Sequence, residues 1–428
     1  MSEILQFRTV REVPDPLSLY IRAGQNGGSA IATLLASGIR SFTGVVVDAP
    51  KPAKNSRQKE LIAMFQTHRL DIVLDTQAIR MATPSGYSDS LSKLPWGGSH
   101  MHMLRSFDSV SVAAAIADYV VDCGFTEVMS PTHLIESAND PWFATDIDTT
   151  ILLRRELDGR NARNTPILYP LAIPLALLRD RQASIALINA LRRAPIDMLL
   201  LRVAGFGKNS SPTAVRTYLD AVPAFHSLRV PVVADNVGGV VGRAVAAFGA
   251  VGGLAHGITV GEHFDPNPWK RAPKEGGGFA PQPRVYVADL DMTFSKSGAE
   301  QLFETAKGKA HFGCNDPNCC PRGVRDMIAA PAQHFLYQRI NEIARLSTVP
   351  EHLRVSQFVD EVRNMSDRAV ASTNLDLGDG KIEERLKKKR LQLDALRRAF
   401  TEQAKARPPV SFSKIAPTRA AREARAAI

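Results

Sequence analysis

Three cysteines lie close together in the second half of the chain, in the segment HFGCNDPNCCPRG. They are Cys314, Cys319 and Cys320, three of the four cysteines in 428 residues. Clustered thiols bind metal more often than they form a disulfide framework. Three thiolates and one imidazole make a closed tetrahedral zinc site, which holds short segments together. The histidines that could supply the imidazole are His311, His334 and His352. We therefore expect a structural Zn²⁺ ion here.

The alternative for this segment is a cluster of reduced structural thiols without metal. The fourth cysteine, Cys123, follows an apolar helix-like stretch and precedes a predicted strand. That setting indicates a buried structural thiol.

Three aspartates directly follow buried apolar runs. Asp48 ends VVVD, Asp75 ends IVLD and Asp235 ends VVAD. Barrel enzymes place catalytic groups at the carboxyl ends of their strands. Two carboxylates facing one another there can divide the roles of nucleophile and general acid or base, because proximity and burial separate their pKa values. The alternative is that each Asp caps the next helix. We favour capping for Asp48 and leave both interpretations open for Asp75 and Asp235.

Glycine-rich and histidine-containing loops offer weaker signals. The loops VAGFGKNSS and ADNVGGVVG could let a substrate approach the backbone, and the helix start after Gly239 could hold a phosphate. The segment HGITVGEHFD could form a metal-binding cluster, although such residues more often divide between core and loop. We expect His100 and His102 to be loop residues and not metal ligands. The candidate substrate-binding residues are Gln77, Ser130, Gly205 and His256.

Short runs rich in Val, Ile and Leu recur with room for a helix between them, which is typical of parallel βα units. There are eight such runs: Leu17–Ala23, Thr43–Asp48, Leu70–Asp75, Thr126–Ser130, Ile167–Ile173, Asp197–Val203, Val230–Asp235 and Gly253–Val260. Amphipathic stretches lie between them. The pattern predicts an α/β fold, a (β/α)8 TIM barrel over residues 1–296.

The remaining segments predict additions to this barrel. Thr83–Ser106 is a long loop, which in a compact domain is functional or disordered. The polar segment Asp265–Gln282 indicates an active-site loop or lid, and Arg284–Phe294 one further strand. Helices and the cysteine cluster form a zinc-binding subdomain over residues 297–366. Residues 367–428 are expected to be a linker and a basic helical tail, with an exposed or partner-binding helix over Lys381–Ala404.

The positive charge of the chain is concentrated at its end. The formal net charge is +10, and residues 381–428 alone contain 14 Lys and Arg against 5 Asp and Glu. A basic tail on a nearly neutral body indicates an electrostatic arm for phosphate backbones. The alternative is a solvated helical tail without a partner.

Membrane and secretion signals are missing from the sequence. It has neither a run of about 18 apolar residues nor a basic start followed by an apolar segment. We expect a cytoplasmic protein that does not enter a membrane.

Together these features resemble the tRNA-guanine transglycosylase superfamily, over roughly residues 15 to 365. IVLDTQAIRMAT is similar to the family's apolar strand ending in Asp-Ser-Gly-Gly, which assigns that motif's Asp to Asp75. VPVVADNVGGVVGRAVAAFGAVGGLAHGI is similar to its seventh-strand, helix and eighth-strand unit. The family binds zinc through three cysteines and a later His in a Glu-His pair, and PEHLRVSQF resembles that pair. The resemblance thus implies that His352 is the nitrogen ligand.

The departures from the family pattern are informative. Thr76 and Gln77 replace Ser-Gly, the cysteine spacing is altered, and LAHGITVGE has no Asp where the family carries its nucleophile. Such divergence resembles the DNA-directed branch, which inserts 7-deazaguanine bases. The resemblance implies a pentosyltransferase that exchanges guanine in DNA through a covalent Asp-glycosyl intermediate. Asp75 and Asp235 would be its catalytic pair.

Three alternatives to this function remain open. They are the same exchange on tRNA, a catalytically silent nucleic-acid-binding barrel, and an unrelated barrel hydrolase or lyase. The resemblance also implies a homodimer, and the basic tail could instead bind a partner protein.

Overall fold

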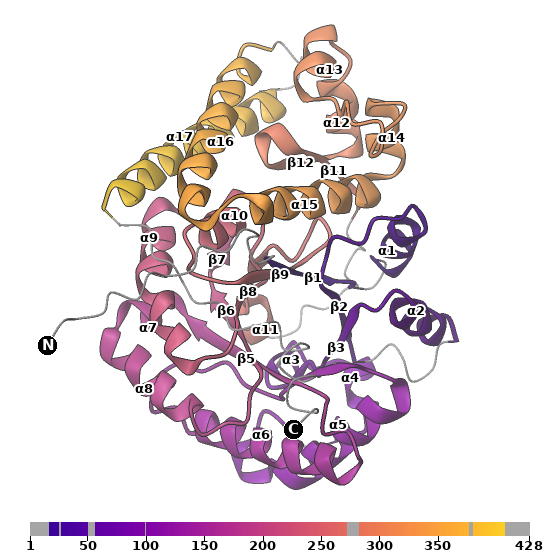
Figure 1. The fold of residues 1–428 in the computed structure, drawn as a ribbon, viewed down its shortest axis with the longest axis vertical. Coiled ribbons are helices and arrows are strands. Elements are labelled where there is room, and N and C mark those ends of the chain that lie inside the picture. Colours follow the sequence, from indigo (N-terminus) through magenta and orange to yellow (C-terminus); the bar gives the residue numbers. More distant parts are fainter. Residues whose placement is uncertain are drawn as a thin grey trace, which may run out of the picture.

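A closed barrel of eight parallel strands forms the body of the protein (Figure 1). The computed structural model describes residues 17–24, 27–49, 56–98, 100–271, 282–375 and 380–406. The barrel strands, in their order around it, are β1 (Ser18–Arg22), β2 (Gly44–Asp48), β3 (Asp71–Asp75), β4 (Glu127–Met129), β5 (Ile167–Pro174), β6 (Met198–Ala204), β8 (Val232–Asp235) and β9 (Gly253–Gly257). Each overlaps one predicted run, so the TIM-barrel prediction is confirmed.

Helices surround the barrel on its outer side. They are α1 (Gly27–Ala36), α2 (Ser56–Thr67), α5 (Ser109–Cys123), α6 (Pro141–Gly159), α7 (Leu175–Arg179), α8 (Arg181–Leu191), α9 (Pro212–Ala221), η2 (Val222–Leu228) and α10 (Gly239–Ala247). Several begin at a residue suited to capping. Asp108 accepts hydrogen bonds from the backbone of Val110 and Ser111, and Asp180 caps α8 in the same way.

The inside of the barrel is filled by side chains that alternate along the strands. An apolar layer consists of Tyr20, Val46, Val73, Met129, Leu168, Met198, Leu200, Val233 and Ala255. Because successive side chains of a strand point to opposite faces, a residue two positions further along also points inward. The next inward positions therefore lie at the carboxyl ends of the strands, above a closed apolar floor.

Short elements cover the carboxyl-end face. Helix α3 (Ala78–Met81) follows β3 directly, and the predicted long loop Thr83–Ser106 contains α4 (Asp89–Ser92) and η1 (Leu104–Ser106). Residue 99 of this loop lies outside the described residues. The buried Trp96 holds this loop down by donating from Nε1 to the carbonyl oxygen of Thr76, over 3.2 Å. β7 (Phe206–Gly207) pairs with β10 (His263–Phe264), and α11 (Asn267–Lys270) follows. Residues 272–281 of the predicted lid lie outside the described part.

A second region packs beside the barrel and consists of a hairpin and helices (Figure 1). Its elements are β11 (Arg284–Val287), η3 (Ala288–Leu290), β12 (Met292–Ser295), α12 (Lys296–Leu302), α13 (Ala306–Phe312), α14 (Val324–Ala329), α15 (Pro331–Thr348), α16 (Glu351–Ser372) and α17 (Gly380–Ala406). We predicted one strand over Arg284–Phe294. The chain instead reverses at Asp291, whose φ of 44° makes the turn between β11 and β12.

Helix α17 is part of the folded body and not an exposed arm. Its side chains Ile382, Leu393 and Phe400 are buried, and the helix packs along α16. Arg216 and Asp220 on α9 contact Glu402 and Gln403 at its far end. The helix prediction for Lys381–Ala404 is thus confirmed in type but wrong in exposure. The basic residues after Ala406 lie outside the described residues.

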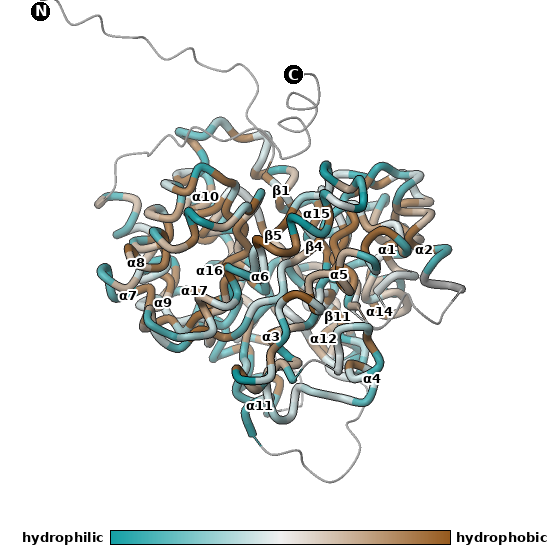
Figure 2. Tube along the Cα trace, turned by 90° about the horizontal axis from the view of Figure 1, so that it is seen from below, coloured by the Kyte–Doolittle hydropathy of each residue, from teal (hydrophilic) through white to brown (hydrophobic). Residues whose placement is uncertain are grey.

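Hydrophilic residues gather on the outer helices and loops, whereas apolar residues concentrate inside (Figure 2). Within the described part of the chain, every helix is too short or too polar to cross a membrane.

We expect the substitution Phe400→Ala to lower the free energy of unfolding by about 3–5 kcal/mol, because a buried ring would be replaced by a cavity. Phe400 packs against Phe248 and Phe358, with ring centroids 6.1 and 5.2 Å away. Urea denaturation measures the change. Leu391→Ala is the control, since Leu391 on the same helix is 62% exposed. Equal effects of the two substitutions would contradict the docked position of α17.

Candidate functional site

Four charged side chains meet inside the barrel at its carboxyl end. Arg22 (β1), Asp75 (β3), Arg202 (β6) and Asp235 (β8) each lie two residues after a member of the apolar layer, at Tyr20, Val73, Leu200 and Val233. The strand period therefore places all four in the next layer up. We call these four residues the mouth quartet.

The mouth quartet is held by ion pairs in which each guanidinium contacts both carboxylates. Arg22 donates from Nη1 to Asp75 Oδ2 over 2.7 Å, and from Nε and Nη2 to the two oxygens of Asp235 over 2.8 and 2.7 Å. Arg202 contacts Asp75 Oδ2 at 2.8 Å and Asp235 Oδ2 at 2.5 Å. The two carboxylates therefore lie close together and share their counter-ions.

Both carboxylates are kept ionised by this arrangement. Burial would raise the pKa of Asp75 and of Asp235, but the guanidiniums of Arg202 and Arg22 outweigh it and hold both pKa values below the ordinary range. A carboxyl group whose pKa is lowered on folding stabilises the fold above the unfolded-state pKa of about 3.9 and loses that contribution as the pH falls. The two aspartates of the quartet are thus both anions at neutral pH.

The sequence did not point to Arg22 and Arg202, although a signal was present. In both LYIRA and LLLRVAG an arginine interrupts an apolar strand at an inward position. A buried charge in such a strand requires a partner. The partners are the two aspartates already chosen, and neither is a helix cap: the cap residues of α3 and α10 are Gln77 and Gly238.

Of the predicted substrate-binding residues, Gln77 and Gly205 lie on the carboxyl-end face. The backbone N–H of Gln77 donates to Asp75 Oδ1 over 2.9 Å, and its side-chain Nε2 donates to Asp48 Oδ1 over 3.1 Å. Asp48 therefore takes part in the polar contacts around the mouth, eight residues before α2 begins. Gly205, with a φ of 76°, donates its N–H to the carbonyl oxygen of Phe264.

Ser130 and His256 point away from the barrel interior. The Ser130 hydroxyl is fully buried against Thr150 on α6, with 2.6 Å between the oxygens. His256 follows the inward Ala255, so it faces outward, where it packs against Phe335 of α15. Burial there lowers the pKa of His256. Strand alternation places both residues on the helix-facing side, away from the mouth quartet.

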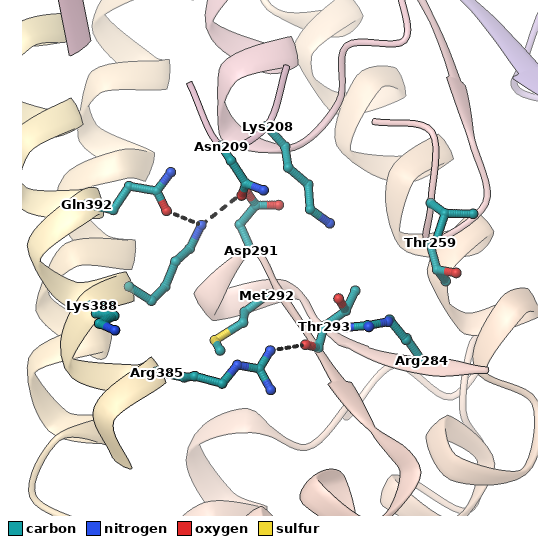
Figure 3. Close-up of a pocket in the computed structure, with 12 residues that line it drawn as sticks. Lys208, Asn209, Thr259, Arg284, Asp291, Met292, Thr293, Arg385, Lys388 and Gln392 are labelled. Carbon is teal, nitrogen blue, oxygen red and sulfur yellow. Dashed lines mark hydrogen bonds and ion pairs between the residues drawn. The ribbon is translucent and has the colours of Figure 1, made fainter. Parts of the chain in front are cut away.

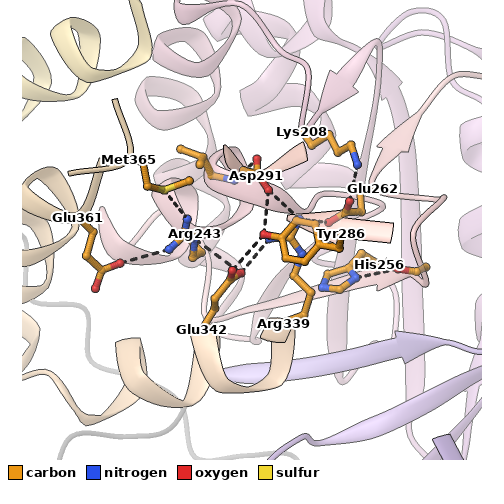
Figure 4. Close-up of polar contacts among 12 residues, drawn as sticks. Lys208, Arg243, His256, Glu262, Tyr286, Asp291, Arg339, Glu342, Glu361 and Met365 are labelled. Atoms are coloured by element: carbon orange, nitrogen blue, oxygen red, sulfur yellow. Dashed lines mark hydrogen bonds and ion pairs between the residues drawn. The ribbon is translucent and has the colours of Figure 1, made fainter. Parts of the chain in front are cut away.

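A second buried ion network joins the barrel to the C-terminal region (Figure 4). Arg339 of α15 contacts Glu262, Asp291 and Glu342 at 2.7, 2.8 and 2.8 Å. It also donates to the hydroxyl of Tyr286. Glu262 belongs to the barrel side, Asp291 to the hairpin. Glu262, one of the two acidic residues of HGITVGEHFD, thus serves this network.

The paired glycines of ADNVGG make room for this network. Gly239 has a φ of 67°, and a Cβ there would lie 2.6 Å from Asp291 Oδ2. The same oxygen accepts a hydrogen bond from the N–H of Val240 at the start of α10, over 3.0 Å. The helix start that we predicted to hold a phosphate therefore holds a carboxylate of the protein itself.

A histidine that the sequence did not single out anchors the long loop after β3. His133 lies within 2.6 Å of Asp146 Oδ1 through Nδ1 and within 2.8 Å of the Met101 carbonyl through Nε2. Its ring stacks on Trp142 at 3.6 Å. Because both ring nitrogens are engaged, we interpret this buried histidine as a structural anchor.

Three thiols and one imidazole converge beside the hairpin. The ligand atoms of Cys314, Cys319, Cys320 and His334 all lie within 4.8 Å of one another. Cys319 Sγ and Cys320 Sγ are 3.7 Å apart, close to the roughly 3.8 Å separation of two sulfurs on one tetrahedral zinc ion. The Nδ1 atom of His334 lies 3.2 and 3.4 Å from these sulfurs. Donor set and spacing fit zinc.

The imidazole of the site is His334, and the prediction of His352 was wrong. Nε2 of His334 lies 3.0 Å from the carbonyl oxygen of Tyr286, to which it can donate while leaving Nδ1 free as a ligand. His352 is exposed on α16. His334 stands on α15, which packs against the hairpin and lies over the cysteine segment, whereas α16 begins beyond the end of α15.

We expect Arg202→Met to lower the free energy of unfolding by about 3–5 kcal/mol, because two buried carboxylates lose a counter-ion. The matched control is Arg193→Met, which removes only an exposed contact with Asp148 and should cost below about 1 kcal/mol. Urea unfolding at neutral pH measures both. A loss of similar size in the two variants would contradict the buried quartet.

Metal analysis tests the zinc site directly. We expect one zinc ion per chain in the purified protein, its loss in His334→Ala, and its retention in His352→Ala. Loss of one of its four ligands weakens a structural zinc site and destabilises the segments that the metal joins. His334→Ala should therefore also lower Tm. Retention of zinc in His334→Ala together with loss in His352→Ala would reverse the ligand assignment.

Comparisons with known proteins support no family assignment. No family model and no curated protein matches the chain. Among solved structures it is similar to an enolase from the Sargasso Sea environmental genome, with 12% identity, 57% of this chain and 54% of that chain covered, and a TM-score of 0.31. The chain thus spans about half the length of that enolase.

Two further solved structures are similar to the chain at comparably low identity and TM-score. The 3-dehydroquinate dehydratase from Enterococcus faecalis has 14% identity, 57% and 89% coverage and a TM-score of 0.34. A modular endo-beta-1,4-mannanase from Cellulomonas fimi has 13% identity, 58% and 67% coverage and a TM-score of 0.36. The barrel assignment therefore stands on the strand pairing itself.

Proposed function

We propose that this protein is a pentosyltransferase that exchanges guanine in DNA for a 7-deazaguanine base. The observation that carries the proposal is the mouth quartet, in which two ionised carboxylates, Asp75 and Asp235, stand together at the carboxyl ends of β3 and β8. Catalytic groups of barrel enzymes come from this end of the strands. The sequence resemblance described above supplies the reaction.

The reaction needs one carboxylate that attacks and one that manages protons. In the first step an oxygen of Asp235 bonds to the sugar C1′ and the C1′–N9 bond breaks, so the electron pair leaves with guanine, which takes up a proton. In the second step N9 of the incoming base attacks C1′, loses its proton and releases the carboxylate. In this proposal Asp75 donates and accepts these protons.

The two arginines give this proposal a specific requirement. Because Arg22 and Arg202 hold both carboxylates ionised, Asp75 can carry a proton only if the bound nucleotide displaces one of its guanidinium contacts. Asp75 receives both through a single oxygen, Oδ2, whereas Asp235 uses both of its oxygens. Asp75 is therefore the carboxylate with fewer ion-pair contacts to lose. A displaced guanidinium could then donate to the purine O6 atom.

The zinc site has a structural role in this proposal. Its four protein ligands would close the tetrahedron, which leaves the ion without an open position for substrate.

A catalytically silent, nucleic-acid-binding barrel is the second candidate. The observation that favours it is the charge balance of the mouth quartet, whose two cations and two anions satisfy one another in the absence of substrate. In that case the quartet would stabilise the barrel, and binding would depend on basic residues elsewhere.

An exchange assay tests the proposal. We expect the full-length protein to release labelled guanine from duplex DNA when a 7-deazaguanine base is supplied, and to do so less well from tRNA. Asp235→Asn should lower the rate by about 10³-fold or more, because the amide cannot form the glycosyl ester. The covalent adduct, trapped and mapped by mass spectrometry, should lie on Asp235.

Folding must be monitored alongside activity, since Asp235 is also an ion-pair partner. Asp235→Asn keeps the volume of the side chain but replaces one acceptor oxygen with an NH2 group that would face an arginine donor. Circular dichroism reports whether the variant is folded. A folded variant with unchanged exchange, or an adduct mapped to another residue, would overturn the assignment of Asp235. Failure of the wild type to exchange on both DNA and tRNA would leave the silent barrel.

A further inference from the structure

A cavity lies between the carboxyl-end face of the barrel and helix α17 (Figure 3). Its volume is about 640 Å³. Twelve residues line it: Lys208, Asn209, Thr259, Val260, Arg284, Asp291, Met292, Thr293, Arg385, Lys388, Lys389 and Gln392. They come from two barrel loops, the β11–β12 hairpin and α17. We call this cavity the basic pocket.

The basic pocket adjoins the part of the barrel that carries Asp235. Lys208 and Asn209 follow β6, and Thr259 and Val260 follow β9. In the order of the barrel, β6 and β9 are the two neighbours of β8, whose last residue is Asp235. A linear polymer bound in the pocket would thus pass beside the mouth quartet.

Positive charge dominates the lining of the basic pocket. Five of its residues are Lys or Arg, and one is acidic. The inner cations have partners in the protein: Lys208 contacts Glu262 at 2.8 Å, and Lys389 contacts Asp291 at 3.6 Å. The outer cations Arg284, Arg385 and Lys388 are exposed.

The outer cations are oriented around the same space. Arg385 lies over the ring of Phe294 and donates to the Thr293 carbonyl through one Nη atom, which leaves its other donors directed elsewhere. Lys388 forms a helix-surface pair with Glu384 at 2.6 Å. Such exposed pairs are weak and exchange readily for another anion. Figure 3 shows that Arg284 approaches from the hairpin and that Arg385 and Lys388 approach from α17.

Neighbouring cations in the pocket repel one another. Burial lowers the pKa of Lys389; the charge of Asp291 opposes this effect, and the charge of Lys208 adds to it. Burial likewise lowers the pKa of Arg385, and the charge of Arg284 adds to the effect. A bound anion would relieve this repulsion.

We infer that the basic pocket binds the phosphodiester backbone of a nucleic acid strand, next to the nucleotide whose base enters the barrel. Its volume is many times that of a single water molecule, about 30 Å³ in the liquid, and its cations stand at separate positions around it. Several spaced cations suit consecutive phosphates, and phosphate contacts set the register of a nucleic acid without reading its sequence.

This inference deepens the proposed function and rests on it for the identity of the strand. It differs from the basic tail predicted from the sequence, because the cations lie on folded elements. Strand binding can be measured without base exchange, so the two proposals can fail separately.

The test compares two double variants of the full-length chain with the same change in net charge. Arg284→Gln/Lys388→Gln removes two exposed cations of the pocket. Lys387→Gln/Lys405→Gln removes two exposed cations of α17 that do not line it. Fluorescence anisotropy with a labelled duplex and its single strand, over a series of salt concentrations, measures the affinity. Circular dichroism verifies folding.

We expect the pocket variant to bind about tenfold more weakly at low salt and to lose roughly one unit of the salt slope for each phosphate contact removed. The control variant should stay close to wild type. Equal weakening in both variants would show that only the overall charge matters and would overturn the inference. Pyrophosphate binding is measured on the same variants. A pocket variant that binds DNA normally but no longer binds pyrophosphate would also overturn the inference, because the pocket would then be a site for a free phosphate compound.

Base exchange, measured on the same proteins, separates the two proposals. Pocket-dependent binding without exchange supports the basic pocket and rejects the transglycosylase. If the wild type exchanges guanine and the pocket variant binds and exchanges as well as the wild type does, the basic pocket is rejected and the transglycosylase proposal is supported.

Discussion

The buried guanidinium of Arg339 is the contact on which the arrangement of the whole molecule depends. It binds Glu262 from the barrel face, Asp291 from the hairpin and Glu342 from its own helix. Asp291 in turn accepts from the start of α10 and contacts Lys389 of α17. Breaking one partner of such a network leaves buried charges without compensation, at a cost of several kcal/mol.

Both candidate sites outside the barrel follow from that network. Tyr286, whose hydroxyl contacts Arg339, offers its carbonyl to His334, which sets the imidazole against the thiols. Glu262 and Asp291 hold Lys208 and Lys389 at the inner end of the basic pocket. The hairpin therefore links the cluster of three cysteines and His334 to the basic pocket, and a metal ion held by that cluster would stiffen the region that carries the hairpin.

The mouth quartet follows the same physical rule with a different result. Two buried anions and two buried cations neutralise one another above the apolar floor of the barrel. An entering nucleotide must compete with those ion pairs, so a site of this kind would open only for a ligand that replaces the contacts it displaces. The proposed transglycosylase requires this exchange of partners, and the silent barrel does without it.

Residues whose role depends on strand period or local composition could be predicted from the sequence. The eight strands, the helix over Lys381–Ala404, and the grouping of the three thiols follow from hydrophobic pattern and spacing, because these are local properties. Asp75 and Asp235 were found by their place at strand ends. Alternation of side chains within a strand would also have predicted that Arg22 and Arg202 face inward. The same alternation would have predicted that Ser130 and His256 face outward.

The remaining features were decided by contacts between distant segments. His334 lies closer to the cysteines in the chain than His352 does, yet only the packing of α15 on the hairpin shows which imidazole reaches the thiols. The sequence around Gly238 and Gly239 is typical of a substrate-binding loop. In the structure the carboxylates of Glu262 and Asp291 occupy the space next to these glycines. The sequence by itself determined the barrel and the aspartates at its strand ends, because strand period and burial are local. The tertiary structure decided which histidine joins the three thiols, how α17 docks and where the basic pocket lies, because each of these features brings together side chains that are far apart in the sequence.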